Sequence, residues 1–224
     1  MALSREQVVE EIANCLDRRR KGLTETERVA LALQDNVLFQ AASLMAIPMF
    51  YAHWEGFAKE VLQHYIEYVE GRSVPMKEVE TSLLAYAWTG SFRKLSGTLT
   101  HERKKELIER FLSTLSSPIA FDQAEKDIDT GSNLFFGVLK GLFECLCLDI
   151  GRMREHEKKL NGLVNRRNNI AHGGRVQKLT QSDVHEYHDL VLQLMGELES
   201  TLLEAIGKDV FIRPGARVIS AVGG

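Results

Sequence analysis

The sequence predicts an all-α fold, a bundle of several helices, and three observations support this. Only four of the 224 residues are proline, so few positions interrupt a helix. Apolar residues recur at intervals of three and four, which is the spacing of a helix with one buried face. The chain has no alternation of strand and helix patterns and no internal repeat. We expect one α-helical domain over residues 1–207, followed by a short irregular or β-prone C-terminal tail, residues 208–224.

The first third of the chain contains the clearest helix signals. Ser4 followed by Gln7 is a capping box, in which each side chain bonds a free backbone N–H at the start of a helix. Pro48 has no backbone donor, so we expect it to kink or split the helix that contains it. Gly71 is suited to end that helix. The helices predicted here cover residues 5–21, 24–34 and 36–70.

The later helices are separated by longer connections. Residues 89–100 and 116–132 are expected to be loops, because they are rich in turn-forming residues. Gly173 stops the helix before it, and Ser182 is expected to cap the last long helix, which ends at Ile206. The other helices predicted in this part of the chain cover residues 83–88, 101–115, 134–148 and 152–172.

Composition and charge exclude several classes of protein. The formal net charge of −3 excludes a protein that coats nucleic acid by bulk positive charge. The three cysteines, Cys15, Cys145 and Cys147, lie in apolar runs and are expected to be buried thiols rather than disulfides or zinc ligands. Polar residues interrupt the apolar stretch 37–54, so we expect a buried central helix rather than a membrane span. With no secretory pattern at the start of the sequence, we expect a cytoplasmic protein that contacts no membrane.

One segment differs in charge from the acidic remainder of the chain. Between Arg152 and Lys178 there are eight basic residues and two acidic ones, a local charge of +6 that leaves −9 elsewhere. A concentrated positive face attracts a phosphate-bearing ligand through Coulomb attraction and counterion release. The alternative is an ordinary solvated helix surface. The basic residues are Arg152, Arg154, Lys158, Lys159, Arg166, Arg167, Arg175 and Lys178.

The same segment contains a polar motif at the end of a predicted helix, Arg167-Asn168-Asn169-Ile170-Ala171-His172. Asn168 and His172 are four residues apart and therefore share one helix face. Histidine titrates near neutral pH, and beside a permanently charged arginine it can exchange a proton while the arginine stabilises an anion. Asn168 either fixes the tautomer of His172 or holds a phosphate oxygen. The alternative is a capped helix end with exposed polar side chains.

This motif, RNNIAH, resembles the Arg-x4–6-His motif of the HEPN superfamily, in the form with Asn directly after the Arg. Its position is also similar, at the end of a late helix that precedes one final long helix. Upstream, residues 50–57 (FYAHWEGF) resemble a Trp-Glu-Gly-Phe-like signature of a bacterial HEPN subgroup. The resemblance covers residues 5–205 and implies an α-helical bundle that dimerises with two Arg/His motifs facing each other.

Many HEPN proteins are metal-independent endoribonucleases, so the resemblance implies roles for particular residues. Arg167 and His172 match the catalytic positions, and Asn168 matches the polar position after the arginine. Arg166 and Glu55 are expected to support them. Glu55, a carboxylate in an apolar stretch, either orients Arg167 or pairs with Lys59. The side chains expected to bind RNA are Arg152, Arg154, Lys158, Lys159 and Arg175. No metal and no other cofactor is expected.

The resulting hypothesis is a homodimeric endoribonuclease in which a 2′-hydroxyl attacks the adjacent phosphorus and leaves a 2′,3′-cyclic phosphate. By family association it acts in a toxin–antitoxin or anti-phage setting, with a protein antitoxin or defence-system partner. The dimer contact is expected at the end of the helix 152–172, through the last helix or through Leu160, Leu163, Val164 and Ile170. One alternative is a non-catalytic HEPN module that binds a partner or a nucleotide. The other is an α-helical adaptor in which the RNNIAH motif is coincidental. A dimer with its two RNNIAH motifs far apart on opposite sides would favour this adaptor.

Overall fold

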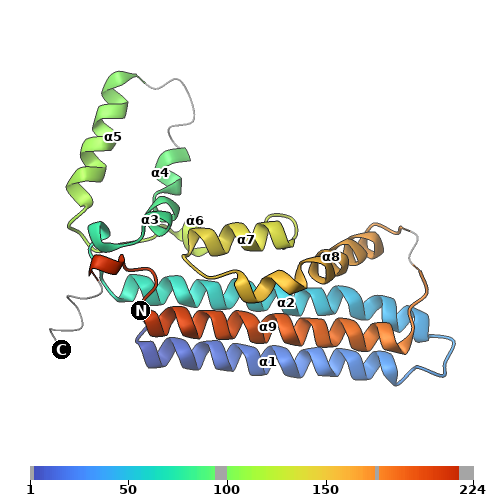
Figure 1. Cartoon of the computed structure of the whole chain (residues 1–224). Helices are drawn as coiled ribbons and strands as arrows, with labels where there is room; N and C mark the ends of the chain where they lie inside the picture. Colours follow the sequence, from blue (N-terminus) through green and yellow to red (C-terminus); the bar gives the residue numbers. More distant parts are fainter. Residues whose placement is uncertain (1–2, 94–99, 175–176, 217–224) are drawn as a thin grey trace.

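In a computed structural model, which describes residues 3–93, 100–174 and 177–216, the described residues form helices and no sheet, so the all-α prediction is confirmed. Three long helices lie side by side and form the body of the molecule: α1 (Arg5–Leu31), α2 (Phe39–Gly71) and α9 (Gln181–Lys208) (Figure 1). The shorter elements are, in chain order, η1 (Met76–Glu78), α3 (Thr81–Ala87), α4 (Thr89–Arg93), α5 (His101–Thr114), α6 (Gln123–Lys126), α7 (Phe136–Cys145), η2 (Gly151–His156) and α8 (Glu157–Ala171).

The core is built around α2, which packs against α1, α8 and α9. Each large aromatic side chain buried along this helix contributes about 1.5–3 kcal/mol through the hydrophobic effect. In Figure 1, α7 and α8 lie along one side of α2, whereas α4 and α5 extend away from the body near the end where the chain begins. The fully buried aromatic residues of α2 are Phe50, Tyr51, Trp54, Phe57, Tyr65 and Tyr68.

Two expected interruptions of the long helices are absent. The helices predicted over 5–21 and 24–34 are one continuous helix, α1, which passes through Gly22. A Cβ at Gly22 would lie 2.5 Å from Cε1 of His53, so this glycine allows close packing on α2 rather than a break. Pro48 lies inside α2 without splitting it. Burial of Ile47 and Phe50 on either side outweighs the roughly 3 kcal/mol penalty of an internal proline.

Several predicted boundaries are also wrong. The expected loops 89–100 and 116–132 contain the short helices α4 and α6. The helix predicted over 152–172 begins as the 3-10 helix η2 and becomes α-helical only at Glu157. Thr180, not Ser182, caps α9, because its hydroxyl accepts from the backbone N–H of Asp183 while the Asp183 carboxylate accepts from the N–H of Thr180. In contrast, the capping box of Ser4 and Gln7 at the start of α1 is confirmed.

The segment after α9 folds back onto the body. Asp209 ends α9 in a left-handed conformation, and its carboxylate accepts a hydrogen bond from the Tyr68 hydroxyl at 2.9 Å. Phe211 is fully buried, and Ile212 forms a single antiparallel bridge with Val79. The β-prone character of the tail therefore produces one bridge and no strand within the part of the tail described, and residues 217–224 lie outside the described residues.

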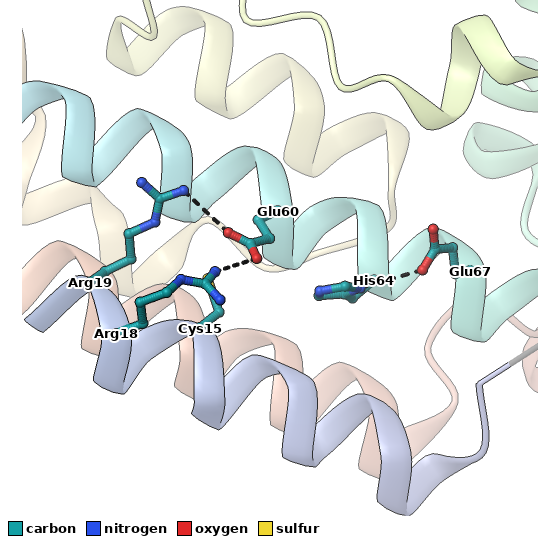
Figure 2. A network of polar contacts seen from close by, with 6 residues as sticks. All are labelled: Cys15, Arg18, Arg19, Glu60, His64 and Glu67. Atoms are coloured by element: carbon teal, nitrogen blue, oxygen red, sulfur yellow. Dashed lines mark hydrogen bonds and ion pairs between the residues drawn. The ribbon is translucent and has the colours of Figure 1, made fainter.

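A polar cluster joins α1 to α2 on the side away from α8. Arg18 and Arg19 of α1 both donate to the Glu60 carboxylate of α2 (Figure 2). Gly56 makes room for them, since a Cβ there would lie 2.6 Å from a guanidinium nitrogen of Arg19. Burial acts to raise the pKa of Glu60, but hydrogen bonds from Arg18, Cys15 and Arg19 outweigh it and lower that pKa to about 2. Glu60 is therefore an ionised link between the two helices.

The apolar stretch 37–54 is only half buried, which corrects the expectation of a buried central helix. Ile47 and Trp54 are fully buried, whereas Met45 is 71% exposed and Val37 is 93% exposed. Among the helices of the described residues, none combines the length and the hydropathy needed to cross a bilayer.

Candidate active site

The C-terminal end of α8 is a tight, glycine-dependent turn that leaves His172 in solvent. Gly173 has a φ of +67°, a left-handed conformation that favours glycine, and its N–H donates to the Ile170 carbonyl at 3.1 Å. The N–H of Gly174 donates to the Asn169 carbonyl at 2.8 Å, and a Cβ at Gly174 would approach that oxygen to 3.1 Å. His172 is exposed at this end, and its imidazole forms no hydrogen bond with the described part of the chain.

Arg167, one turn and a half earlier, is held from three directions. Its Nη1 donates to Oδ1 of Asn168 at 2.8 Å and to Oδ1 of Asn133, in the connection before α7, at 3.1 Å. The guanidinium carbon lies 5.0 Å from the centre of the Tyr51 ring on α2, which is a cation–π contact. Three segments of the chain therefore fix one half-buried cation. Asn168 thus holds the arginine, whereas we expected it to contact His172 or a phosphate.

Tyr51 connects this arginine to the loop before α7. Its hydroxyl accepts a hydrogen bond from the backbone N–H of Leu134 at 2.8 Å. Burial raises the pKa of Tyr51 to about 12, against the lowering effects of the Leu134 hydrogen bond and of Arg167. The ring therefore remains a neutral phenol at physiological pH, and it fixes the position of Asn133, the residue before Leu134.

Glu55 lies one turn along α2 from Tyr51 and takes the second of the two roles expected for it. Its Oε1 accepts a hydrogen bond from the hydroxyl of Thr130 at 2.7 Å, and Lys59 Nζ lies 3.8 Å from the same oxygen. Thr130 is itself buried. Glu55 therefore anchors the loop that carries Asn133, and among the described residues no hydrogen bond or ion pair joins it to Arg167.

Arg166 points to a different surface from Arg167. Its guanidinium carbon lies 5.8 Å from the centre of the Tyr187 ring on α9, and its Nη1 is buried without a hydrogen-bond partner among the described residues. Lys159 lies on the same side of α8, at a pocket of about 400 Å³ between α8 and α9 that also contains Asp183 and Glu186. The structure thus does not bring Arg166 to the group that holds Arg167.

The remaining basic residues do not form one continuous positive face. Arg152 pairs with two carboxylates of α9, at 3.4 Å from Glu204 and 3.9 Å from Glu197. Arg154 and Lys158 are exposed, and Arg175 lies outside the described residues. Lys158 lies in the first turn of α8, about 13 Å along the helix axis from Arg167. The local charge of +6 counted along the sequence is therefore partly neutralised by acidic residues of α9.

The apolar face of α8 proposed for dimer contact is used within the chain. Leu160, Leu163 and Val164 are fully buried against the core, and only Ile170 remains partly exposed. The expectation that this face lies between subunits is wrong for those three leucine and valine side chains, because they attach α8 to α2 and α9.

Two residues of the site, Tyr51 and Asn133, were missed by the sequence reasoning. Tyr51 lies within the FYAHWEGF stretch, whose Trp and Glu attracted attention, and Asn133 follows a turn-rich cluster that we interpreted only as a loop. No spacing rule connects either residue to Arg167. Among the residues that the structure describes, no group of three or more His, Cys, Asp or Glu side chains is arranged to hold a metal ion.

The whole chain was compared with models of known protein families. The family model described as HEPN_MAE_28990-like HEPN matches residues 4–211. The chain belongs to this HEPN family. The resemblance to the HEPN superfamily is therefore confirmed, and HEPN domains are often ribonucleases that bind RNA and dimerise. No curated protein and no solved structure matches this HEPN chain.

Proposed function

We propose that this HEPN protein is a metal-independent endoribonuclease whose reacting groups are Arg167 and His172. The observation that carries the proposal is the fixed guanidinium of Arg167, which Tyr51, Asn133 and Asn168 hold. An exposed histidine, His172, follows at the same end of α8. A preoriented cation and an imidazole that can exchange a proton are the two groups that phosphodiester cleavage without metal requires.

The chemistry follows from these two groups. The 2′-hydroxyl of the RNA attacks the adjacent phosphorus, forming a P–O2′ bond, while His172 accepts the hydroxyl proton. The bond from phosphorus to the 5′-oxygen breaks, and that oxygen takes up a proton as it leaves. Arg167 stabilises the charge that develops on the phosphoryl oxygens. The products are a 2′,3′-cyclic phosphate end and a 5′-hydroxyl end.

The two proton transfers require an acid and a base, and each chain supplies one motif histidine. A homodimer with a two-fold axis beside the end of α8 supplies a second His172 and a second Arg167 to one cleft. Since Leu160, Leu163 and Val164 are buried within the chain, this pairing uses Ile170 and neighbouring exposed residues of α8 and α9. By association with the family, the setting is a toxin–antitoxin or anti-phage system with a neutralising protein.

The test is cleavage of mixed RNA by the purified protein in excess EDTA, with the ends of the products analysed by mass. We expect activity that persists in EDTA and cyclic phosphate at the 3′ ends. Arg28→Ala is the matched control for Arg167→Ala, because Arg28 is an exposed arginine of α1 outside the basic segment expected to bind RNA. Strict dependence on added Mg²⁺ or Mn²⁺ contradicts the proposal. RNA or nucleotide binding without cleavage identifies the alternative, a non-catalytic HEPN module.

A further inference from the structure

On the side of α2 opposite to Tyr51 lies an apolar groove that the proposed function does not use. We call it the α1–α2 groove; it has a volume of about 710 Å³. The residues of α2 that line it recur at three and four, so they form one stripe, and Tyr51 lies about 150° around the helix from that stripe. The residues that define the groove are Val29, Leu33, Leu38, Met45, Met49 and His53.

The groove is far more apolar than an ordinary solvent-exposed helix surface. Met45 is 71% exposed, Val29 65% and Leu38 55%. No Asp, Glu, Lys or Arg occurs between residues 36 and 54, so the exposed face of α2 carries no full charge over about four turns. Contiguous exposed apolar patches of this kind mark interaction sites in soluble proteins. A helix lying in the groove would bury these side chains.

The same chain also exposes an amphipathic helix without a full set of partners. α5 has no buried residue, and it extends from the body next to α4 (Figure 1). One side of it rests on the body through Phe111, whose ring is 5.0 Å from that of Trp88. Leu107 packs against the core on the same side, whereas the remaining apolar residues of α5, Ile108 and Leu112, are each 58% exposed. An isolated helix of 14 residues is marginal in water, so α5 requires further packing to be stable.

The groove and α5 match in length, polarity and charge. The α2 side of the groove, from Leu38 to His53, is about 22 Å long, and the 14 residues of α5 span about 21 Å. Ile108 and Leu112 are one turn apart, as are Met45 and Met49. Glu25 is the only carboxylate among the residues that line the described groove. Lys104 and Lys105 precede Ile108 by four and three residues and share its face of α5, whereas Glu102 and Glu106 of the same turns lie on a different face.

Within one molecule the two surfaces are at opposite ends of α2. The groove lies beside the N-terminal half of α2, whereas α5 follows the C-terminal end of this helix, which is about 50 Å long. Two copies placed antiparallel about a two-fold axis bring each α5 to the groove of the other, so both contacts form at once and the assembly closes. We propose that α5 of one copy docks into the α1–α2 groove of a second copy, reciprocally.

This contact is separate from the proposed active site. A docked α5 meets the groove face of α2, and Arg167 lies against Tyr51 on the other face, so the end of α8 remains open. At one end the groove is closed by His53 and Gly22, beyond which lies the cluster of Arg19 and Glu60 (Figure 2). The inference therefore stands or falls independently of RNA cleavage.

The test is sedimentation velocity of four full-length samples at tens of micromolar protein. The arm variant carries Ile108→Glu and Leu112→Glu, and the groove variant carries Met45→Glu and Met49→Glu. All four residues are about half-exposed or more, so both variants are expected to fold, which thermal unfolding checks. The matched control is Val9→Glu, at an exposed apolar residue outside both surfaces.

We expect the arm and groove variants to sediment at a smaller mass than the wild-type assembly, and the control at the wild-type mass. An equimolar mixture of the arm and groove variants restores part of the larger species, because the intact α5 of the groove variant enters the intact groove of the arm variant and forms one of the two reciprocal contacts. Wild-type protein that is monomeric, or variants that sediment like wild type, overturn the proposal. If only the groove variant loses the larger species, the groove binds another occupant. If both variants lose the larger species and the mixture recovers none of it, the pairing of the groove with α5 is rejected.

Discussion

Replacing Glu60 by glutamine tests how much the polar cluster between α1 and α2 contributes to stability. The pKa of Glu60 is about 2, against 4.5 for an unperturbed glutamate, and each unit corresponds to about 1.4 kcal/mol, which sets an upper limit of about 3 kcal/mol. The Arg18 side chain is 60% exposed, so solvent screening reduces this figure. We expect Glu60→Gln to lower the free energy of unfolding by about 1–2 kcal/mol at pH 7, or about 2–8 °C in melting temperature.

The pH dependence of this effect has a definite sign. A carboxylate whose pKa is depressed in the folded state adds stability that is complete above its unfolded pKa, near 4.5, and that disappears as the pH falls toward 2. The difference between wild type and Glu60→Gln should therefore shrink to less than half of its neutral value at pH 3. Glutamine resembles the protonated acid, so the two proteins converge as Glu60 takes up its proton.

Urea unfolding followed by circular dichroism at pH 7 and pH 3 measures this difference. The control is Glu67→Gln, which removes the neighbouring contact of Glu67 with His64 at 3.4 Å and is expected to change stability by less than about 0.5 kcal/mol (Figure 2). A Glu60→Gln effect no larger than that of the control would refute the reasoning. A difference that stays constant between pH 7 and pH 3 would also refute it.

Three further predictions concern the site. Arg167→Ala should lower the RNA cleavage rate at least about 100-fold. Arg167→Lys should recover little of that rate, because lysine lacks the planar guanidinium that binds phosphate through two hydrogen bonds. A rate near that of the wild type for Arg167→Lys in a single-turnover assay would refute this prediction. Asn133→Ala should slow turnover about 10-fold without changing RNA affinity, since Asn168 still holds the arginine; an unchanged kcat argues against a positioning role. Wild-type protein mixed with excess His172→Ala should cleave RNA more slowly than the same amount of wild-type protein alone. A cleavage rate equal to the sum of the rates of the two separate proteins contradicts a site shared between subunits.

The helices were predictable wherever local signals agree with packing. The α5 helix, His101–Thr114, matches the prediction over 101–115, and the Ser4 capping box marks the start of α1. Local signals failed at Gly22, where close packing of α1 on α2 keeps α1 continuous, and Pro48 does not split α2. Such contacts between distant segments cannot be predicted from the spacing of apolar residues within one helix.

The candidate site was predictable only in part for the same reason. Arg167 and His172 belong to one family motif, and the sequence predicts their position at one helix end. Tyr51 and Asn133 reach Arg167 from other segments, and only the fold brings them together. Charge counting along the chain also misjudged Arg152, because carboxylates of α9, remote in sequence, neutralise it.

The most direct test of the central claim compares RNA cleavage by wild type and His172→Ala in EDTA. His172 is exposed beside Gly173, so its replacement should leave the melting temperature within about 1 °C, because surface substitutions change stability by less than about 0.5 kcal/mol. We predict that the wild type releases 2′,3′-cyclic phosphate ends and that the variant cleaves about 10²–10⁴-fold more slowly. Cleavage by His172→Ala at a rate near that of the wild type would contradict the assignment.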